Sequence, residues 1–278
     1  MTGSTGQTLP RSSHAAPQGP GVTGVRVLAA EWTKLTGLRS TLWVALGTVL
    51  AAASLAFALG LFVRPGDGRT AASLLVSGAV LAQLGFLVLG VLVGTGEFST
   101  GTFRATFTAV PRRVPVLAAQ VLVTSAVAVT TAVAALGASY LATAGPRAAH
   151  GLALDAVDPG TARVLVGFVL YQAGVALLGL GIGALARHAT AALVTGVVLL
   201  VVVDQALATN PGRVADTVRA LLPASAARLM HDDARIAALD ATSLGLHLAP
   251  WAAGLVLALW ALALLGAAAY RLRRHDLA

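Results

Sequence analysis

The chain has 278 residues, of which 57% are hydrophobic, 5% aromatic and 11% charged, and its formal net charge at pH 7 is +8. Soluble domains carry about 25% charged residues, so this composition excludes an ordinary water-soluble protein. Cysteine is absent from the sequence, which excludes disulfides and cysteine-based metal sites, and the six histidines show no metal-ligand spacing. We therefore expect no metal centre.

The segment that precedes the first long apolar run divides into two parts. Residues 1–21 are rich in Gly, Ser, Thr and Pro and show no periodicity, which predicts a disordered tail. Residues 22–40 carry apolar side chains at helical steps, with Glu31 off that stripe, which predicts an amphipathic helix on the membrane surface. The stripe consists of Val22, Val25, Leu28, Trp32 and Leu35. Residues 41–278 are then expected to form the transmembrane domain.

Charge-free windows dominate this predicted domain. Five of them, with 24, 27, 33, 23 and 30 residues, hold no Asp, Glu, Lys or Arg, whereas a helix needs roughly 20 apolar residues to cross a bilayer. Because helices satisfy their own backbone hydrogen bonds in lipid, the sequence predicts an all-α membrane protein with six transmembrane helices. The helices are expected at about 41–63, 71–95, 115–144, 164–186, 189–207 and 249–270.

Basic residues predict the orientation of these helices. With the amino terminus inside, the inner segments hold eleven Lys and Arg residues and the outer segments hold eight, four of them in one long loop where the rule weakens. Both termini are therefore expected in the cytoplasm. Arginine supplies 18 of the 19 basic residues, which is typical of a GC-rich bacterial genome and favours a bacterial plasma membrane. The net charge suits an anionic inner leaflet, so no nucleic acid partner is expected.

A polar segment, GEFSTGTFRATFTAVPRR, separates the second and third predicted spans at residues 96–113. Ser99 or Thr100 is suited to cap a helix amino terminus, where the negative charge of Glu97 is favourable. Pro111 would end that helix. Its apolar face would consist of Phe103, Phe107 and Val110. The segment therefore predicts a short cytoplasmic helix that lies along the inner membrane surface.

Residues 208–248 are predicted to form an outer subdomain before the last span. Asn210 and Pro211 fit a helix cap and a first helical position, and Pro223 would end that helix. Its shared face would consist of Val214, Val218 and Leu221. Residues 225–239 predict a second short helix, so we expect two helices on the outer face.

Few polar side chains fall within the predicted spans. Gln83 and Gln172 lie near the middle of two spans, where they predict interhelical hydrogen bonds and are candidates to line a pathway. Asp204 is the only acid within a span, which makes it a candidate functional residue; solvation or capping of the outer loop explains it equally well. Two Gly-x-x-x-Gly pairs, at 90–94 and 179–183, permit close helix packing.

Three patches resemble the ABC-2 family of transporter permeases. GEFSTGTFRATFTAVPRR is similar to the family's GEY-S-x-GT segment, with Phe98 where the family often has tyrosine. AEWTKLTGLRSTLW at 30–43 resembles the family's entry segment, and LLPASAARL at 221–229 resembles its outer-loop pattern. The order of the predicted elements is also similar: a surface helix, two spans, a cytoplasmic helix, three spans, outer helices and a last span.

The resemblance implies the permease subunit of an ATP-driven exporter. Two permease subunits, either two copies or a copy and a paralogue, would form the pathway, and a separate ATPase subunit would bind ATP and Mg²⁺. The cytoplasmic coupling helix would receive the motion of that ATPase. On this resemblance the coupling residues are Glu97, Phe98, Ser99, Thr100, Gly101, Thr102 and Arg104.

No catalytic motif is evident in the chain itself. Its single lysine, Lys34, lies outside any glycine-rich loop, so no ATP-binding Walker motif is present, and neither a cofactor nor an enzyme activity is expected. Three alternatives remain. A non-transporting immunity or scaffold protein would share the fold, an ion-coupled carrier would want several intramembrane acids, and an intramembrane hydrolase built on Ser139 would want a histidine within a span.

Overall fold

A computed structural model describes residues 24–37, 39–64, 66–99 and 114–276. Every regular element within these ranges is a helix. The predicted tail, Val22, and the part of the polar segment that runs from Thr100 to Arg113 lie outside the described residues.

Six of the described helices are long and apolar enough to cross a membrane, which confirms the predicted all-α, six-span architecture. The second and fifth spans are each assembled from three consecutive helical pieces. The spans are α2 (Arg39–Gly60); α3 (Ala71–Leu75), η1 (Val76–Gly78) and α4 (Ala79–Ser99); α6 (Val114–Ala142); α8 (Pro159–Ala186); α9 (Ala189–Val197), η2 (Val198–Val202) and α10 (Val203–Ala208); and α13 (Pro250–Asp276).

The start of the fourth span differs from the one predicted. The fourth span begins at Pro159 rather than near 164, because the Asp158 carboxylate accepts a hydrogen bond from the Thr161 amide at 2.7 Å and caps the helix. Arg163 therefore lies on a helix and not in a loop. The polar connection before it also contains a short helix, α7 (Ala144–Ala149), which follows α6 almost directly.

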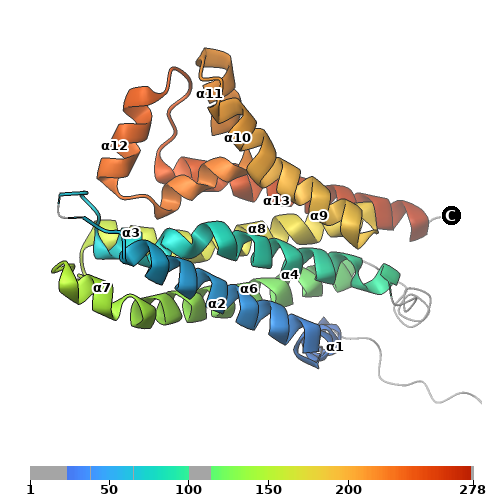
Figure 1. The fold of residues 1–278 in the computed structure, drawn as a ribbon. Helices are drawn as coiled ribbons and strands as arrows, with labels where there is room; N and C mark the ends of the chain where they lie inside the picture. The colour runs from blue at the N-terminus through green and yellow to red at the C-terminus, as the bar shows by residue number, and fades with distance from the viewer. Residues whose placement is uncertain (1–23, 38, 65, 100–113, 277–278) are drawn as a thin grey trace, which may run out of the picture.

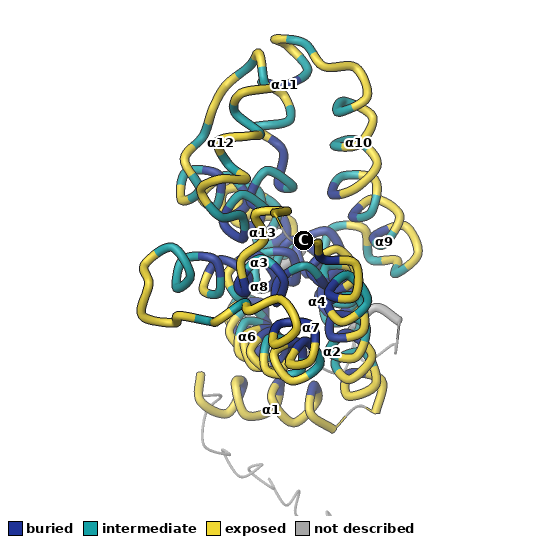
Figure 2. Tube along the Cα trace, turned by 60° about the vertical axis from the view of Figure 1, so that its left-hand side comes forward, coloured by how far each residue is buried: buried dark blue, intermediate teal, exposed yellow. Residues whose placement is uncertain are grey.

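The centre of the molecule is the pair formed by α4 and α8, where buried positions concentrate (Figure 2). The two helices approach so closely that a Cβ atom at Gly90 would overlap the carbonyl group of Ala176, and one at Gly179 would lie 2.7 Å from the Leu87 carbonyl oxygen. Gly94 and Gly183 face each other at the same crossing. The two Gly-x-x-x-Gly pairs are thus the contact surfaces of α4 and α8, as their spacing permits.

Helix α1 (Gly24–Gly37) lies across one end of the bundle and packs mainly on α6 (Figure 2). The predicted helix is present, and three residues of the predicted stripe, Val25, Leu28 and Trp32, are exposed on the protein, as a face directed at a membrane surface requires. Leu35 of the stripe is buried against the protein together with Val27 and Glu31. Glu31 tolerates this position because Lys34 forms an ion pair with it.

The bundle has two different ends. We call the proximal end the one that holds α1, the last turn of α4 and the carboxyl end of α13, and the distal end the one that holds α3 and α7 (Figure 1). Residues 209–249 extend the distal side and are called the distal subdomain. In Figure 1, α10 and α11 lean away from the bundle on the side where α12 also lies.

The distal subdomain contains three short helices, so the prediction of two was wrong. They are α11 (Arg213–Ala220), the 3-10 helix η3 (Pro223–Met230) and α12 (Asp233–Thr242). The predicted cap at Asn210 and Pro211 is also wrong, because α11 begins only after Gly212. The segment predicted as one helix at 225–239 is split because the Asp232 carboxylate accepts from the Arg235 amide at 2.9 Å and starts a new helix.

Candidate functional site

The predicted coupling residues are only partly described. The backbone of Glu97, Phe98 and Ser99 continues α4, so the second span runs four residues past its predicted end and finishes at the proximal end. Thr100, Gly101, Thr102 and Arg104 lie outside the described residues. The coupling role of all seven residues stays a prediction.

The two intramembrane glutamines form interhelical hydrogen bonds, as predicted. Gln83 on α4 accepts a hydrogen bond from the Tyr171 hydroxyl on α8 at 2.7 Å. Gln172, which is fully buried, donates from Nε2 to the Ala79 carbonyl oxygen at 3.3 Å, and its Oε1 has no hydrogen-bond partner among the described residues. Both bonds connect α4 with α8, so they reinforce the glycine-mediated crossing with direction-dependent contacts.

Asp204 forms a bidentate ion pair with Arg219 on α11. Arg219 Nε lies 3.1 Å from Asp204 Oδ1, and Arg219 Nη2 lies 3.3 Å from Oδ2. The aspartate side chain is 27% exposed and the arginine side chain 36%. Of the predicted roles for Asp204, this geometry fits the capping of the outer loop. It does not favour an ion relay, because the charge of the carboxylate is already paired with Arg219.

A cavity of about 250 Å³ opens where the bundle meets the distal subdomain, and we call it the distal cavity. One wall is a face of the second span, from Ser73 through Val76 and Val80 to Gln83. Tyr171 adds to that wall. The other wall comes from η3 and α12 and includes Ala227, Met230, His231, Asp232 and Arg235. Of the three candidate pathway residues, Gln83 lines this cavity, whereas Gln172 and Asp204 are not among its lining residues.

His231 brings an uncharged ring to this cavity at neutral pH. The pKa of His231 is lowered to about 4, mainly by burial and also by the positive charges of Arg235, Arg228 and Arg163, while Asp232 acts in the opposite direction. The ring atom Nδ1 is buried and has no hydrogen-bond partner among the described residues. His231 is therefore a neutral polar group with unused hydrogen-bonding capacity.

An ion pair and a hydrogen bond attach the distal subdomain to the bundle. Arg163 on α8 pairs with Asp233 on α12 at 2.7 Å. The Trp260 indole donates to the Leu221 carbonyl oxygen at 2.9 Å. Trp260 lies ten residues into α13, a depth of about 15 Å, so η3 begins beside the span and not above it. The wall of the cavity that η3 and α12 form is thus attached to the bundle before η3, through Leu221, and at the start of α12, through Asp233.

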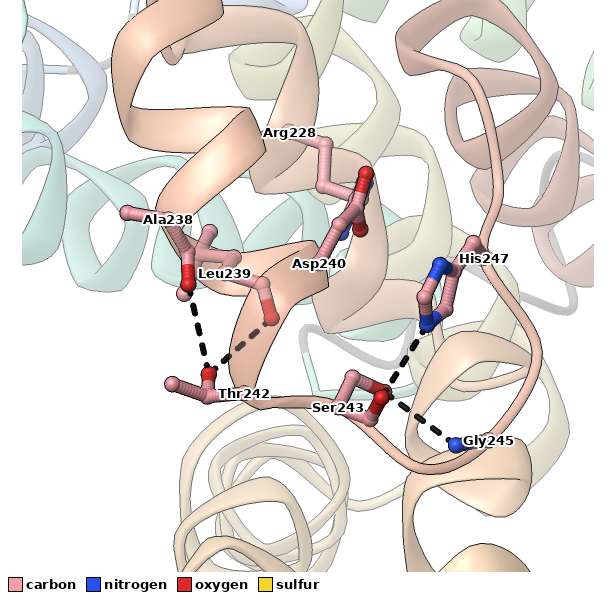
Figure 3. Close-up of polar contacts among 8 residues, drawn as sticks. All are labelled: Arg228, Ala238, Leu239, Asp240, Thr242, Ser243, Gly245 and His247. Carbon is pink, nitrogen blue, oxygen red and sulfur yellow. Dashed lines mark hydrogen bonds and ion pairs between the residues drawn. The ribbon is translucent and has the colours of Figure 1, made fainter.

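The link from α12 to α13 is closed by a second set of contacts (Figure 3). Arg228 Nη2 lies 2.6 Å from Asp240 Oδ1, which ties η3 to α12. Ser243 Oγ accepts from the Gly245 amide at 3.3 Å, and His247 Nε2 lies 3.2 Å from the Ser243 carbonyl oxygen. Figure 3 shows these side chains gathered around the carboxyl end of α12, where they fix the path of the chain into the last span.

The contacts around the cavity were not predictable as a set. No sequence motif marks Tyr171, His231 or Arg235. The one local signal is that Tyr171 directly precedes the mid-span Gln172, which suggested a polar contact in the fourth span. Ser139, the candidate hydrolase serine, is 1% exposed, so no substrate reaches it in this conformation. Within the described ranges, no group of three His, Asp or Glu side chains is arranged to hold a metal ion.

No family model matches the sequence, and no curated protein matches it. The resemblance to ABC-2 permeases stays a prediction from the three sequence patches and the predicted order of the elements.

Proposed function

We propose that the chain is the permease subunit of an ATP-driven ABC-2 type exporter. The observation that carries the proposal is the GEFSTGTF segment, which leaves the second of six membrane-spanning helices at the proximal end. The amphipathic α1 lies at the same end (Figure 1). This end would face the cytoplasm of a bacterium, and the distal subdomain would face outward.

In this proposal the chain transmits motion and does not hydrolyse ATP. A separate ATPase subunit, carrying ATP and Mg²⁺, would bind at the proximal end, and a second permease subunit would complete the pathway. Closure of the ATPase would push on residues 97–104 and hence on α4. Because α4 is locked to α8 by the glycine crossing and two glutamine hydrogen bonds, the two helices would move as one body.

Reconstitution with an ATPase tests this proposal. The chain is purified together with the ATPase encoded beside it in the genome, and ATP hydrolysis is measured in proteoliposomes with and without the chain. We expect the two proteins to copurify and the chain to alter the rate of hydrolysis. Glu97→Ala should keep the complex but return hydrolysis to the rate of the ATPase alone, because the negative charge at the coupling segment is lost.

Asp155→Ala is the matched control, since Asp155 is an exposed acid in the distal loop between α7 and α8. It should leave hydrolysis unchanged. An ATPase that ignores the chain, or a Glu97→Ala variant that couples normally, would contradict the proposal.

Labelling with a thiol reagent tests the orientation. Because the sequence has no cysteine, Thr100→Cys supplies a single thiol beside the end of α4. A membrane-impermeant maleimide should modify it in inside-out vesicles and leave it unmodified in intact cells. Modification in intact cells would place the proximal end outside and refute the coupling role.

A further inference from the structure

We propose that the distal cavity is a binding site for a small linear amphiphile with one anionic end. The inference goes beyond the exporter proposal, because binding to the chain alone needs neither an ATPase nor a second subunit. It rests on the shape of the cavity, on its apolar middle, and on hydrogen-bond donors that the described protein leaves unused.

The shape of the cavity favours a linear ligand. Its bundle wall follows one face of the second span from Ser73 to Gln83, a length of ten helical residues or about 15 Å. Its volume of about 250 Å³ is close to the lower limit of roughly 300 Å³ for small-molecule pockets. A short chain fits such a space better than a fused-ring body.

The middle of the cavity is apolar. Val76 and Val80 face it from the bundle, and Ala227 and Met230 face it from η3. Removal of alkyl groups from water gains about 25 cal/mol per Å² of buried area, and methionine adapts to ligands of varied shape. An alkyl segment therefore has favourable contacts along most of the length of the cavity.

Both ends of the cavity offer donors. At one end, Gln83 Oε1 is engaged by Tyr171, while the Gln83 amide nitrogen has no acceptor among the described residues. On the α12 side, Arg235 has no carboxylate within ion-pair distance in the described part of the chain. The neighbouring Asp232 carboxylate is already committed to the Arg235 amide at 2.9 Å and to the Thr70 hydroxyl at 3.4 Å.

This pattern selects a ligand of one chemical class. Arginine binds carboxylate and phosphate groups through charge-assisted hydrogen bonds, so the anionic end is expected at Arg235. Neutral His231 next to it adds an unpaired ring atom and no competing charge. The ligand would have its anionic group at Arg235 and its alkyl segment toward Gln83. Such a molecule is either a lipid of the surrounding leaflet or a water-borne acid.

Thiol protection in the cysteine-free chain tests this inference. Ala227→Cys places a thiol on the cavity wall, and Ala208→Cys places a control thiol at the end of α10, where the chain forms no part of the cavity lining. The full chain is held in nanodiscs of zwitterionic lipid, and the rate of maleimide labelling is measured with decanoate, decanol and inorganic phosphate. Decanoate should slow the labelling of the cavity thiol only, and decanol should require about tenfold higher concentrations because it lacks the charge.

Charge variants complete the test. Arg235→Gln should raise the half-protecting concentration of decanoate about tenfold. Arg213→Gln, which changes an exposed arginine of the same subdomain that is not a lining residue, should leave it unchanged. Inorganic phosphate should not protect the thiol, because it lacks the alkyl segment.

Anionic phospholipid in the nanodisc separates the two sources. If it competes with decanoate, the ligand comes from the bilayer; if it does not, the ligand comes from water. Equal protection by decanol and decanoate, or protection that survives Arg235→Gln, would overturn the inference. Ser73→Cys on the opposite wall is a second reporter, and failure of both cavity thiols to react would refute the open cavity itself.

Discussion

The α4–α8 pair and the fifth span are held in the molecule by opposite means. In the second and fourth spans 61% of the most apolar window is buried, compared with 17% in the fifth. Backbone contact through glycine and buried amide hydrogen bonds fix the former, whereas the tip of the latter is tied down by one partly exposed ion pair, Asp204–Arg219. The α4–α8 pair is thus tightly packed, whereas the end of the fifth span is held by few contacts.

The largest expected effect comes from breaking the rigid centre. Gly90→Ala introduces a Cβ atom that overlaps the Ala176 carbonyl group, so α4 and α8 must separate. Overpacking of this kind costs about 1–3 kcal/mol, which thermal unfolding in detergent will show as a lower midpoint. Gly137→Ala is the control, because a Cβ atom there meets no other atom within 4 Å. An equal shift in both variants would mean that the crossing is not tight.

An intermediate effect is expected from the pH dependence of the distal subdomain. His231 has a pKa of about 4 in the folded chain, below its ordinary value of 6.5, so the unfolded state binds the proton more tightly. Stability of η3 and α12 is therefore complete above pH 6.5 and falls as the pH drops toward 4. The slope is at most about 1.4 kcal/mol per pH unit, and partial exposure reduces it. Hydrogen exchange of these segments between pH 7 and pH 4.5 measures the loss.

His231→Gln is the control for this dependence, since it removes the titrating ring and keeps a polar side chain. The charges that face the ring are those of Arg235, Arg228, Arg163 and Asp232. The variant should lose the dependence. The same decline in the variant as in the original chain would assign it to Asp232 or to another carboxylate.

The smallest effect is expected at the tip of the fifth span. Asp204→Asn removes the charge that pairs with Arg219, and because both partners are about one third exposed, the loss should be about 1 kcal/mol or less. Faster hydrogen exchange should appear in α10 and α11 and nowhere in α4 or α8. A double-mutant cycle with Arg219→Gln isolates the pair. Loss of the whole fold in Asp204→Asn would contradict the peripheral role of this contact.

The features predicted correctly are those encoded by composition and local spacing. The six spans follow from five charge-free windows and one apolar run interrupted only by Asp204, and glycines four residues apart permit the close packing that is observed between α4 and α8. Gln83 and Gln172 were expected to bond between helices because an amide in lipid has few other partners. In each case the sequence signal lies within one predicted helix.

The features predicted wrongly depend on contacts between segments distant in sequence. On α1 the packing of Val27 and Glu31 was not predicted, because the sequence pattern alone does not show that this helix also contacts α6. The carboxylate of Asp232 splits a helical pattern that looked continuous. The distal cavity joins three segments separated by about 50 to 90 residues, Gln83, Tyr171 and His231 among them, and no local signal links them.

The π-helical turn at Val198–Val202 sets the direction in which the last turns of the fifth span point. Such a turn accommodates one residue more than an α-helical turn, so it rotates everything that follows by about 100° relative to an uninterrupted helix. Regular α-helical winding of this valine- and leucine-rich stretch at unchanged length would therefore turn the Asp204 carboxylate away from Arg219, whereas deletion of one residue from the stretch would restore regular winding and leave Asp204 facing Arg219. The direction in which α10 presents Asp204 thus depends on one extra residue in the middle of the fifth span.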